Sequence, residues 1–523
     1  MLNNVTQYLR QSAATYAGKT AFRDARRSLT FAGLNEQSRL LACSINAALG
    51  GRIKQPVGVF LPKNTDCVIA FFAAAYSGNF YTPLDISMPK SRLVSIAEIL
   101  HPAVIITDAD RIEAVAETFP DAVLVNIENV GIELADNILL ENIQRAIIDT
   151  DPLYTMFTSG STGIPKGVVI SHRAVIDYTE WLSETFSFSE KTIFGNQAPF
   201  YFDNSVLDIY STVKNGCETV IIPEEMFLLP KRLCHYLDEN GINTIFWVPS
   251  ALVLVANSGV LGAVCPNGLE KVLFCGEVMP TKQLNIWKQA LPSAMYANLY
   301  GPTEITDVCT YYIVDREFRD DESLPIGFPC RNIDILVLNE NNEAVSGDEL
   351  GELCVRGTCL AHGYYGNADK TSSAFTQNPL NDKYPEKIYR TGDLVRYNEM
   401  GELLFAGRKD YQIKHMGHRI ELGEIETAAG EQAAVERSCA LYDAEKQTIV
   451  LFVAPENVDK MKLYAHLKTC LPRYMLPALI ITEKELPLNP NGKIDRVKLK
   501  EKLAGSGEIE RKNNRSDQGI ASL

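Results

Sequence analysis

The stretch that decides the fold covers residues 154–168 and reads YTMFTSGSTGIPKGV. An apolar, strand-like run leads into residues 158–167, where hydroxyl side chains, three glycines and a lysine follow closely on one another. Glycine lets a backbone turn tightly enough for its N–H groups to surround anionic oxygens. We therefore interpret residues 158–167 as a phosphate-binding loop.

This loop differs from the Walker A type of phosphate loop. From Gly160 the sequence reads GSTGIPKG, and Lys493 in the downstream run NPNGKID is followed by Ile494, so the pattern GxxxxGK[ST] is not matched. A flexible Ser/Gly turn without a ligand is the alternative interpretation of residues 158–167. Motifs elsewhere in the chain are needed to decide between a phosphate-binding loop and a turn without a ligand.

Composition and charge favour small-molecule chemistry. The chain has 523 residues, of which 46% are hydrophobic, so it can bury a large core and should form two or more compact units. The formal net charge of −15 argues against a nucleic-acid partner, because phosphate backbones require a basic surface.

No targeting or metal-binding pattern is recognisable. The N-terminal residues lack the basic-then-apolar pattern of a signal peptide, and the longest apolar run, Cys67–Tyr76, is too short to span a bilayer. We therefore expect a cytoplasmic protein without membrane insertion. The twelve cysteines form no CxxC pair and no cluster at zinc spacing, which predicts reduced thiols and no structural metal.

From about Leu29 to Leu403, β-rich runs alternate with segments of helical spacing, which predicts an α/β fold with largely parallel sheets. The expected strands include 56–60, 103–107, 219–222, 244–248 and 271–275, and the expected helices include 92–100 and 231–240. Closely spaced strands at 335–338, 351–356, 387–389 and 403–407 predict a β-rich subdomain. The chain is thus divided into a large domain at 1–409, a small α+β domain at 410–504 and a disordered polar tail at 505–523.

Four further motifs accompany the phosphate loop. They are NLYGPTE (298–304), YRTGDL (389–394), GRKDYQIKHMGHRIELGEIE (407–426) and NPNGKID (489–495). In order and spacing the five motifs resemble the adenylate-forming superfamily of acyl-CoA synthetases, luciferases and amino-acid adenylation domains. The resemblance implies layered α/β/α sheets with a β-barrel-like subdomain, a mobile C-terminal lid domain, and ATP with Mg²⁺ as cofactors.

The resemblance also implies roles for individual residues. Those expected to hold the β- and γ-phosphates are Thr158, Ser159, Gly160, Ser161, Thr162, Gly163 and Lys166. Thr303 would contact the α-phosphate and Glu304 would bind Mg²⁺, a hard cation that prefers carboxylates. The remaining nucleotide-binding positions are Gly276, Glu277, Asn298, Tyr300, Gly301, Asp393 and Arg408.

Two residues in the C-terminal part have implied roles of their own. Lys493 is similar to the lysine that bridges carboxylate and phosphate during adenylation, where its charge would stabilise the phosphoryl oxygens. Asp410 is similar to the hinge on which the small domain swings. In isolation, Lys493 reads equally as part of a solvated basic run, Asp393 as a turn residue and Arg408 as a surface arginine.

The run APFYFDNSVLDIY (198–210) resembles the acyl pocket of amino-acid adenylation domains, where an aspartate pairs with the substrate's α-ammonium. Here that aspartate is Asp203, and a buried carboxylate implies a cation in the substrate. The alternative is a capping aspartate at the start of a helix. The other implied pocket residues are Asn204, Leu207, Trp247, Leu273, Cys275, Leu299, Asp307 and Val308.

These pocket residues predict a small amino acid, since Trp247 and the leucines leave little volume. Together with LFCGEVMP (273–280) they look closest to D-alanine:D-alanyl-carrier-protein ligases. The sequence departs from those ligases at Asp307 and Asn204, where they carry apolar residues. If both side chains face the pocket, the substrate carries a hydroxyl or a second amine; Asp307 pointing elsewhere is the alternative.

The thiol acceptor must come from another molecule. The chain contains no condensation motif, no carrier attachment site and no thioesterase elbow, so a phosphopantetheinylated carrier protein in trans is the expected partner. An acyl-CoA synthetase is the first alternative. A catalytically inactive nucleotide-binding regulator is the second, although Lys493, Glu304 and the loop hydroxyls are all present.

Overall fold

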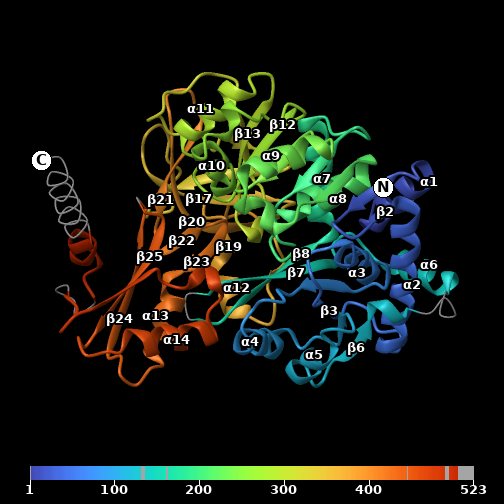
Figure 1. Ribbon diagram of the computed structural model, residues 1–523, viewed down its shortest axis with the longest axis horizontal. Coiled ribbons are helices and arrows are strands. Elements are labelled where there is room, and N and C mark those ends of the chain that lie inside the picture. Colours follow the sequence, from blue (N-terminus) through green and yellow to red (C-terminus); the bar gives the residue numbers. More distant parts are fainter. Residues whose placement is uncertain (1, 131–135, 161–162, 445, 489–493, 504–523) are drawn as a thin grey trace, which may run out of the picture.

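The computed structural model describes residues 2–130, 136–160, 163–444, 446–488 and 494–503 (Figure 1). The chain builds layered α/β sheets, so the expected fold class is confirmed. Among the described residues, no helix combines the length and apolarity needed to cross a membrane. The expected disordered tail at 505–523 lies outside the described residues.

The first sheet has seven strands in the order β18-β8-β7-β4-β3-β5-β6. Its centre is parallel, and β8 and β18 add an antiparallel edge. The strands are β3 (Pro56–Val59), β4 (Phe80–Pro83), β5 (Val104–Thr107), β6 (Val123–Asn126), β7 (Pro152–Thr158), β8 (Lys166–Ser171) and β18 (Gly363–Tyr364). The expected phosphate loop is the connection between β7 and β8, the antiparallel pair next to the edge strand β18.

The second sheet has nine strands in the order β15-β14-β13-β12-β11-β9-β10-β1-β2. The six strands from β13 to β1 are parallel. The strands are β1 (Thr20–Arg23), β2 (Ser28–Thr30), β9 (Ile193–Asn196), β10 (Glu218–Ile221), β11 (Thr244–Trp247), β12 (Lys271–Cys275), β13 (Met295–Tyr300), β14 (Thr310–Ile313) and β15 (Phe328–Pro329). All five strands expected in the α/β region are present within a residue or two.

Helices pack between and outside these sheets. They are α1 (Thr6–Thr15), α2 (Phe31–Leu49), α3 (Thr65–Tyr76), α4 (Lys90–Leu100), α5 (Ile112–Thr118), α6 (Asn137–Ala146), α7 (His172–Phe186), α8 (Ser205–Asn215), α9 (Pro230–Glu239), α10 (Pro249–Asn257) and α11 (Thr281–Ala290). The apolar run Cys67–Tyr76 lies in α3, whose residues from Thr65 are all buried apart from Asp66. Phe72 of α3 contacts Tyr210 of α8, with ring centroids 5.8 Å apart, so α3 joins the cores of both sheets.

The expected β-rich subdomain is a five-stranded antiparallel sheet, β16-β17-β20-β19, with β21 on the other half of β20. Its elements are β16 (Ile333–Leu338), β17 (Gly351–Gly357), α12 (Ala368–Ala374), β19 (Phe375–Gln377), β20 (Lys387–Tyr397) and β21 (Leu403–Arg408). The strand expected at 387–389 continues to Tyr397. Its pairing shifts register beside both neighbouring strands, and Gly392 within it has a positive φ of 72°.

The C-terminal elements lie to one side of the larger body, next to β20 and β21 (Figure 1). They are β22 (Gln412–His415), β23 (His418–Glu421), α13 (Leu422–Gly430), β24 (Arg437–Asp443), β25 (Thr448–Ala454), α14 (Lys460–Cys470) and β26 (Leu479–Thr482). A separate core cluster belongs to these residues, as expected for a small α+β unit. The domain boundary at Asp410 stays a prediction.

Candidate active site

The phosphate-binding loop has the tight backbone that its glycines predict. Gly163 adopts a left-handed conformation (φ 79°), and its N–H donates to the Gly160 carbonyl at 2.9 Å. A Cβ atom on Gly160 would collide with the Ile164 carbonyl oxygen, so only glycine fits there. The Thr158 hydroxyl is buried without a hydrogen-bond partner among the described residues. Ser161 and Thr162 lie outside the described residues.

The ends of this loop contact the C-terminal hairpin formed by β22 and β23. The Ser159 hydroxyl donates to the Arg419 carbonyl at 2.7 Å and accepts from the Glu421 N–H at 3.2 Å. The Lys166 Nζ lies 3.9 Å from the Glu421 carboxylate. Burial, followed by the nearby Arg419, lowers the pKa of Lys166.

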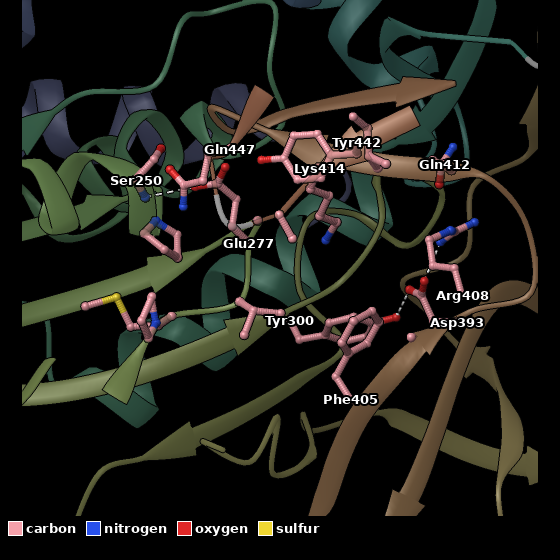
Figure 2. Close-up of a pocket in the computed structure, with 18 of the residues that line it drawn as sticks. Ser250, Glu277, Tyr300, Asp393, Phe405, Arg408, Gln412, Lys414, Tyr442 and Gln447 are labelled. Carbon is pink, nitrogen blue, oxygen red and sulfur yellow. Dashed lines mark hydrogen bonds and ion pairs between the residues drawn. The ribbon is translucent and has the colours of Figure 1, made fainter. Parts of the chain in front are cut away.

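A cavity of about 560 Å³ lies between β13, the β20–β21 edge and the C-terminal hairpin (Figure 2). On its wall the Tyr300 hydroxyl and the Arg408 guanidinium both donate to the Asp393 carboxylate. Arg408 also donates to Asp410 at 2.6 and 2.7 Å, and Asn298 donates to the Pro325 carbonyl at 2.8 Å. Asp393 and Arg408 are therefore neither a plain turn residue nor a surface arginine.

Glu277 links the same cavity to the hairpin. Its carboxylate accepts from the Ser250 N–H at 2.8 Å and from the Gly417 N–H at 2.9 Å, while Gly276 beside it has a positive φ of 101° (Figure 2). Gly301 follows Tyr300, and a Cβ there would collide with the Asp307 carbonyl. The nucleotide-binding candidates that line this cavity are Gly276, Glu277, Asn298, Tyr300, Asp393 and Arg408.

Glu304 is the most deeply buried acid of the cleft. It lies in the 3₁₀ turn η5 (Thr303–Ile305) and accepts from Tyr364 at 2.7 Å and from Arg419 at 2.6 Å. Burial alone would raise its pKa, but Arg419 and Lys166 outweigh burial and lower the pKa to about 2. Glu304 therefore carries a negative charge at physiological pH.

Asp203 precedes α8, and burial raises the pKa of its carboxyl, opposed by the neighbouring Thr303 hydroxyl. The capping alternative finds no support, since Asn204 is the N-cap residue and its side chain makes no capping hydrogen bond. The Asn204 amide nitrogen is buried without a partner among the described residues.

The apolar pocket candidates divide between two faces of the nine-stranded sheet. Leu273, Cys275 and Leu299 share one face and one core cluster, which also contains Leu207 and Val308. Trp247 pairs in register with Phe274 and packs in the other cluster, where its indole donates to the Gly195 carbonyl at 2.8 Å. The structure therefore does not bring Trp247 to the side of Cys275, and Trp247 does not limit the volume on that face.

Asp307 is buried, with a positive φ of 72°, and its carboxylate accepts from the Tyr178 hydroxyl at 2.6 Å. Burial, followed by the charge of Asp203, raises its pKa well above the ordinary value. Burial and then Asp307 likewise raise the pKa of the Cys275 thiol. Asp307, Asp203 and Cys275 thus lie within electrostatic range of one another.

Four site residues escape the sequence analysis. Tyr154 begins the stretch at 154–168 but lies in its apolar strand, and Tyr178 lies in a helix outside every motif, so no sequence signal indicates a ligand at either tyrosine. Lys414 and Arg419 stand inside the motif at 407–426, and their positive charge among apolar residues could have drawn attention to them. Lys493 lies outside the described residues, and Asp410 is held by its ion pair with Arg408.

Comparisons with known proteins show the family of this chain. The AMP-binding enzyme family model matches residues 9–365. A D-alanine–D-alanyl carrier protein ligase of Bacillus licheniformis is 31% identical over 95% of this chain and 98% of its own. An L-proline–[L-prolyl-carrier protein] ligase of Streptomyces coelicolor is also 31% identical, over 95% of this chain and 96% of its own.

The fold is shared with a solved adenylation domain, AlmE of Vibrio cholerae in complex with glycyl-adenosine-5′-phosphate, with a TM-score of 0.81 at 22% identity over 97% of this chain and 98% of that one. The chain belongs to the AMP-binding enzyme family. Its resemblance to stand-alone amino-acid adenylation domains is confirmed by relatives that match along nearly their whole length.

Proposed function

We propose that the chain is an ATP-dependent amino acid:carrier protein ligase. In the first step a carboxylate oxygen of the amino acid attacks the α-phosphorus of ATP, the bond to the β-phosphate breaks, and aminoacyl-AMP and diphosphate form. In the second step a phosphopantetheine sulfur attacks the acyl carbonyl and AMP leaves with the bonding electrons. Asp203, a half-buried carboxylate without an ion-pair partner among the described residues, is the single observation that favours an amino acid over other acids.

The cleft fits a nucleotide. Asp393 presents a carboxylate suited to ribose hydroxyls, and the unpartnered Thr158 hydroxyl and the glycine backbone around Gly160 suit phosphate oxygens. Bringing two anions together demands positioning and charge neutralisation rather than a proton-transfer group. Lys166 and the undescribed Lys493 are the cations proposed for that task.

Glu304 fits Mg²⁺ by charge and by its position beside Thr303, and the ion when bound would neutralise phosphate charge. In this structure, however, Arg419 and Tyr364 occupy both carboxylate oxygens. The hairpin also covers Ser159 of the phosphate loop. We therefore interpret the arrangement as the one used for thiol transfer, after diphosphate has left.

The thiol donor is proposed to be a carrier protein rather than coenzyme A, because the chain matches two carrier protein ligases along nearly its full length. A reaction that consumes ATP and charges a free thiol belongs in the cytosol, where we place this protein. The fold itself does not distinguish the two thiols.

Amino-acid-dependent exchange of diphosphate into ATP tests the first step, with all L- and D-amino acids and a set of short fatty and aryl acids. A strong signal with one amino acid supports the proposal and names the substrate. Exchange with non-amino acids alone would overturn the role of Asp203 and favour an acyl-CoA synthetase. Supplying either a pantetheinylated carrier or coenzyme A to the preformed adenylate then identifies the thiol.

A further inference from the structure

We infer that the amino acid carries a hydrogen-bond donor on its side chain, a hydroxyl or an amine, and that Asp307 receives it. This inference rests on the proposed function and narrows its substrate class. A pocket for alanine would be apolar. Here a buried carboxylate, that of Asp307, is the group that determines specificity.

Asp307 is buried and its backbone is tightly constrained. Only 1% of it is exposed, and the neighbouring Thr306 shares its left-handed backbone, with φ of 63° and 72° for the two residues. Gly301 makes room for its backbone, since a Cβ there would collide with the Asp307 carbonyl. The Tyr178 hydroxyl, 129 residues away in sequence, fixes one carboxylate oxygen at 2.6 Å. These constraints hold the Asp307 carboxylate in one position, in which a ligand can contact it.

The Asp307 carboxylate is buried and lies within electrostatic range of Asp203. It influences the pKa values of Cys275 and Tyr154, and both of these residues also respond to Asp203, the proposed ammonium anchor. Among the described residues neither carboxylate has a cation within ion-pair distance; Lys414 contributes only at longer range, and its Nζ lies 5.5 Å from the Tyr300 ring.

Buried polar atoms without hydrogen-bond partners are a second line of evidence for a polar ligand near Asp203 and Asp307. The Tyr154 hydroxyl is completely buried and has no hydrogen-bond partner among the described residues, and neither has the Asn204 amide nitrogen. Buried polar groups in native proteins are nearly always paired, so these atoms indicate a polar ligand. An apolar side chain would leave Tyr154 and Asn204 unpaired. A hydroxyl could donate to Asp307 or Tyr154 and accept from Asn204, whereas an ammonium group could only donate, to Asp307 and Tyr154.

The two donors predict different pH behaviour. An amine needs an ionised Asp307, and since burial raises the pKa of that carboxyl, binding of a diamino acid should strengthen as pH rises towards it. A hydroxyl pairs with the neutral carboxyl, so Asp307 adds no pH dependence to the binding of a hydroxy amino acid. Asp203, whose pKa is also raised by burial, affects both kinds of substrate through the α-ammonium. The difference between the two slopes of log KM against pH therefore separates the two donors.

The test compares matched amino acids in diphosphate exchange: serine, 2,3-diaminopropionate and alanine, then threonine, 2,4-diaminobutyrate and 2-aminobutyrate, each in both enantiomers. We expect a donor-bearing member to exceed its apolar isostere by on the order of 10²-fold in kcat/KM, because a site built around a hydrogen bond rejects analogues that lack it. Preference for alanine or 2-aminobutyrate would overturn this inference while leaving the ligase intact. Exchange with no amino acid would instead refute the proposed function.

Two variants assign the selectivity to Asp307. Asp307→Val should lower the donor-to-apolar ratio at least tenfold, and an unchanged ratio in a folded protein would overturn the assignment. If Asp307→Val does not fold, Tyr178→Phe serves instead, because it frees the carboxylate without changing the fold's charge. Tyr76→Phe is its control: Tyr76 is buried and donates to Asn35 at 2.6 Å, remote from the pocket, so the ratio should stay constant.

Discussion

At the scale of single residues, the chemistry of this site depends on which acidic side chains have a cationic partner and which have none. Glu304 is neutralised by Arg419, whereas Asp203 and Asp307 have no ion-pair partner among the described residues. Burying a carboxylate without a partner costs desolvation free energy. That cost is offset only when a ligand supplies the missing cation or hydrogen-bond donor. The unpaired acids therefore define the amino-acid end of the cleft.

Asp203→Asn should weaken use of the amino acid far more than use of ATP. Removal of one partner of a buried charge pair costs about 3 kcal/mol, so the amino-acid kcat/KM should fall roughly 100-fold. Steady-state diphosphate exchange with either substrate varied measures both effects. An unchanged KM for the amino acid would rule out Asp203 as the ammonium anchor.

His172 predicts a pH dependence of stability. It is buried and its Nδ1 accepts from the Val5 N–H at 3.3 Å, and burial lowers its pKa from 6.5 to about 4. The unfolded chain therefore binds the proton more readily, so stability is fully present above pH 6.5 and is lost as pH falls towards 4. About 2 kcal/mol should disappear between pH 7 and pH 5.

Urea unfolding at both pH values measures this loss. In His172→Asn the amide oxygen can still accept the Val5 N–H but does not titrate, so the variant should lose about 2 kcal/mol less than the parent over the same interval. His362→Asn, which alters an exposed histidine, should behave as the parent does. Equal pH dependence in all three proteins would refute the assignment.

At the scale of elements, the hairpin β22–β23 joins the C-terminal unit to the cleft. Arg419 reaches Glu304, the Gly417 N–H reaches Glu277, and His418 stacks on Tyr474 with ring centroids 3.5 Å apart. Behind the hairpin, Glu424 of α13 forms a buried ion pair with Arg92 of α4. Polar contacts therefore contribute to this arrangement, as expected for the interface that we propose opens and closes.

Arg419→Ala should impair thiol transfer and spare adenylation. Its loss leaves Glu304 buried without its closest cation in the present arrangement, which costs about 3 kcal/mol and should slow the second step roughly 100-fold. Diphosphate exchange and thioester formation from supplied aminoacyl-AMP measure the two steps separately. Arg396→Ala, at an exposed position of β20, is the control. Equal loss in both steps would contradict the interpretation of the hairpin.

At the scale of the whole molecule, one cleft serves two reactions only if the C-terminal unit takes two positions. Lys493→Ala should reduce aminoacyl-AMP formation at least 100-fold, since its charge is proposed to act only in adenylation. Thioester formation from supplied aminoacyl-AMP should be unaffected. Lys498→Ala, which removes a neighbouring exposed lysine of the same basic run, should change neither step. Loss of both steps in Lys493→Ala would refute its assigned role.

The sequence by itself determined the family, the α/β layers and the nucleotide motifs. Those features are local: strand periodicity predicts β12 to the residue, and a turn that binds phosphate must use glycine at Gly160. Local steric rules and the order of motifs along the chain are enough to predict these features, because they do not depend on tertiary packing.

Only the tertiary structure decided which face each pocket residue occupies and which charges meet. Trp247 and Leu273 both lie in apolar strands, yet strand register sends them to opposite faces of the sheet. Asp307 meets Tyr178 across 129 residues, and Glu304 meets Arg419 across 115. Such pairings depend on how sheets and domains pack, because a charge's partner is fixed by distance in space and not by spacing along the chain.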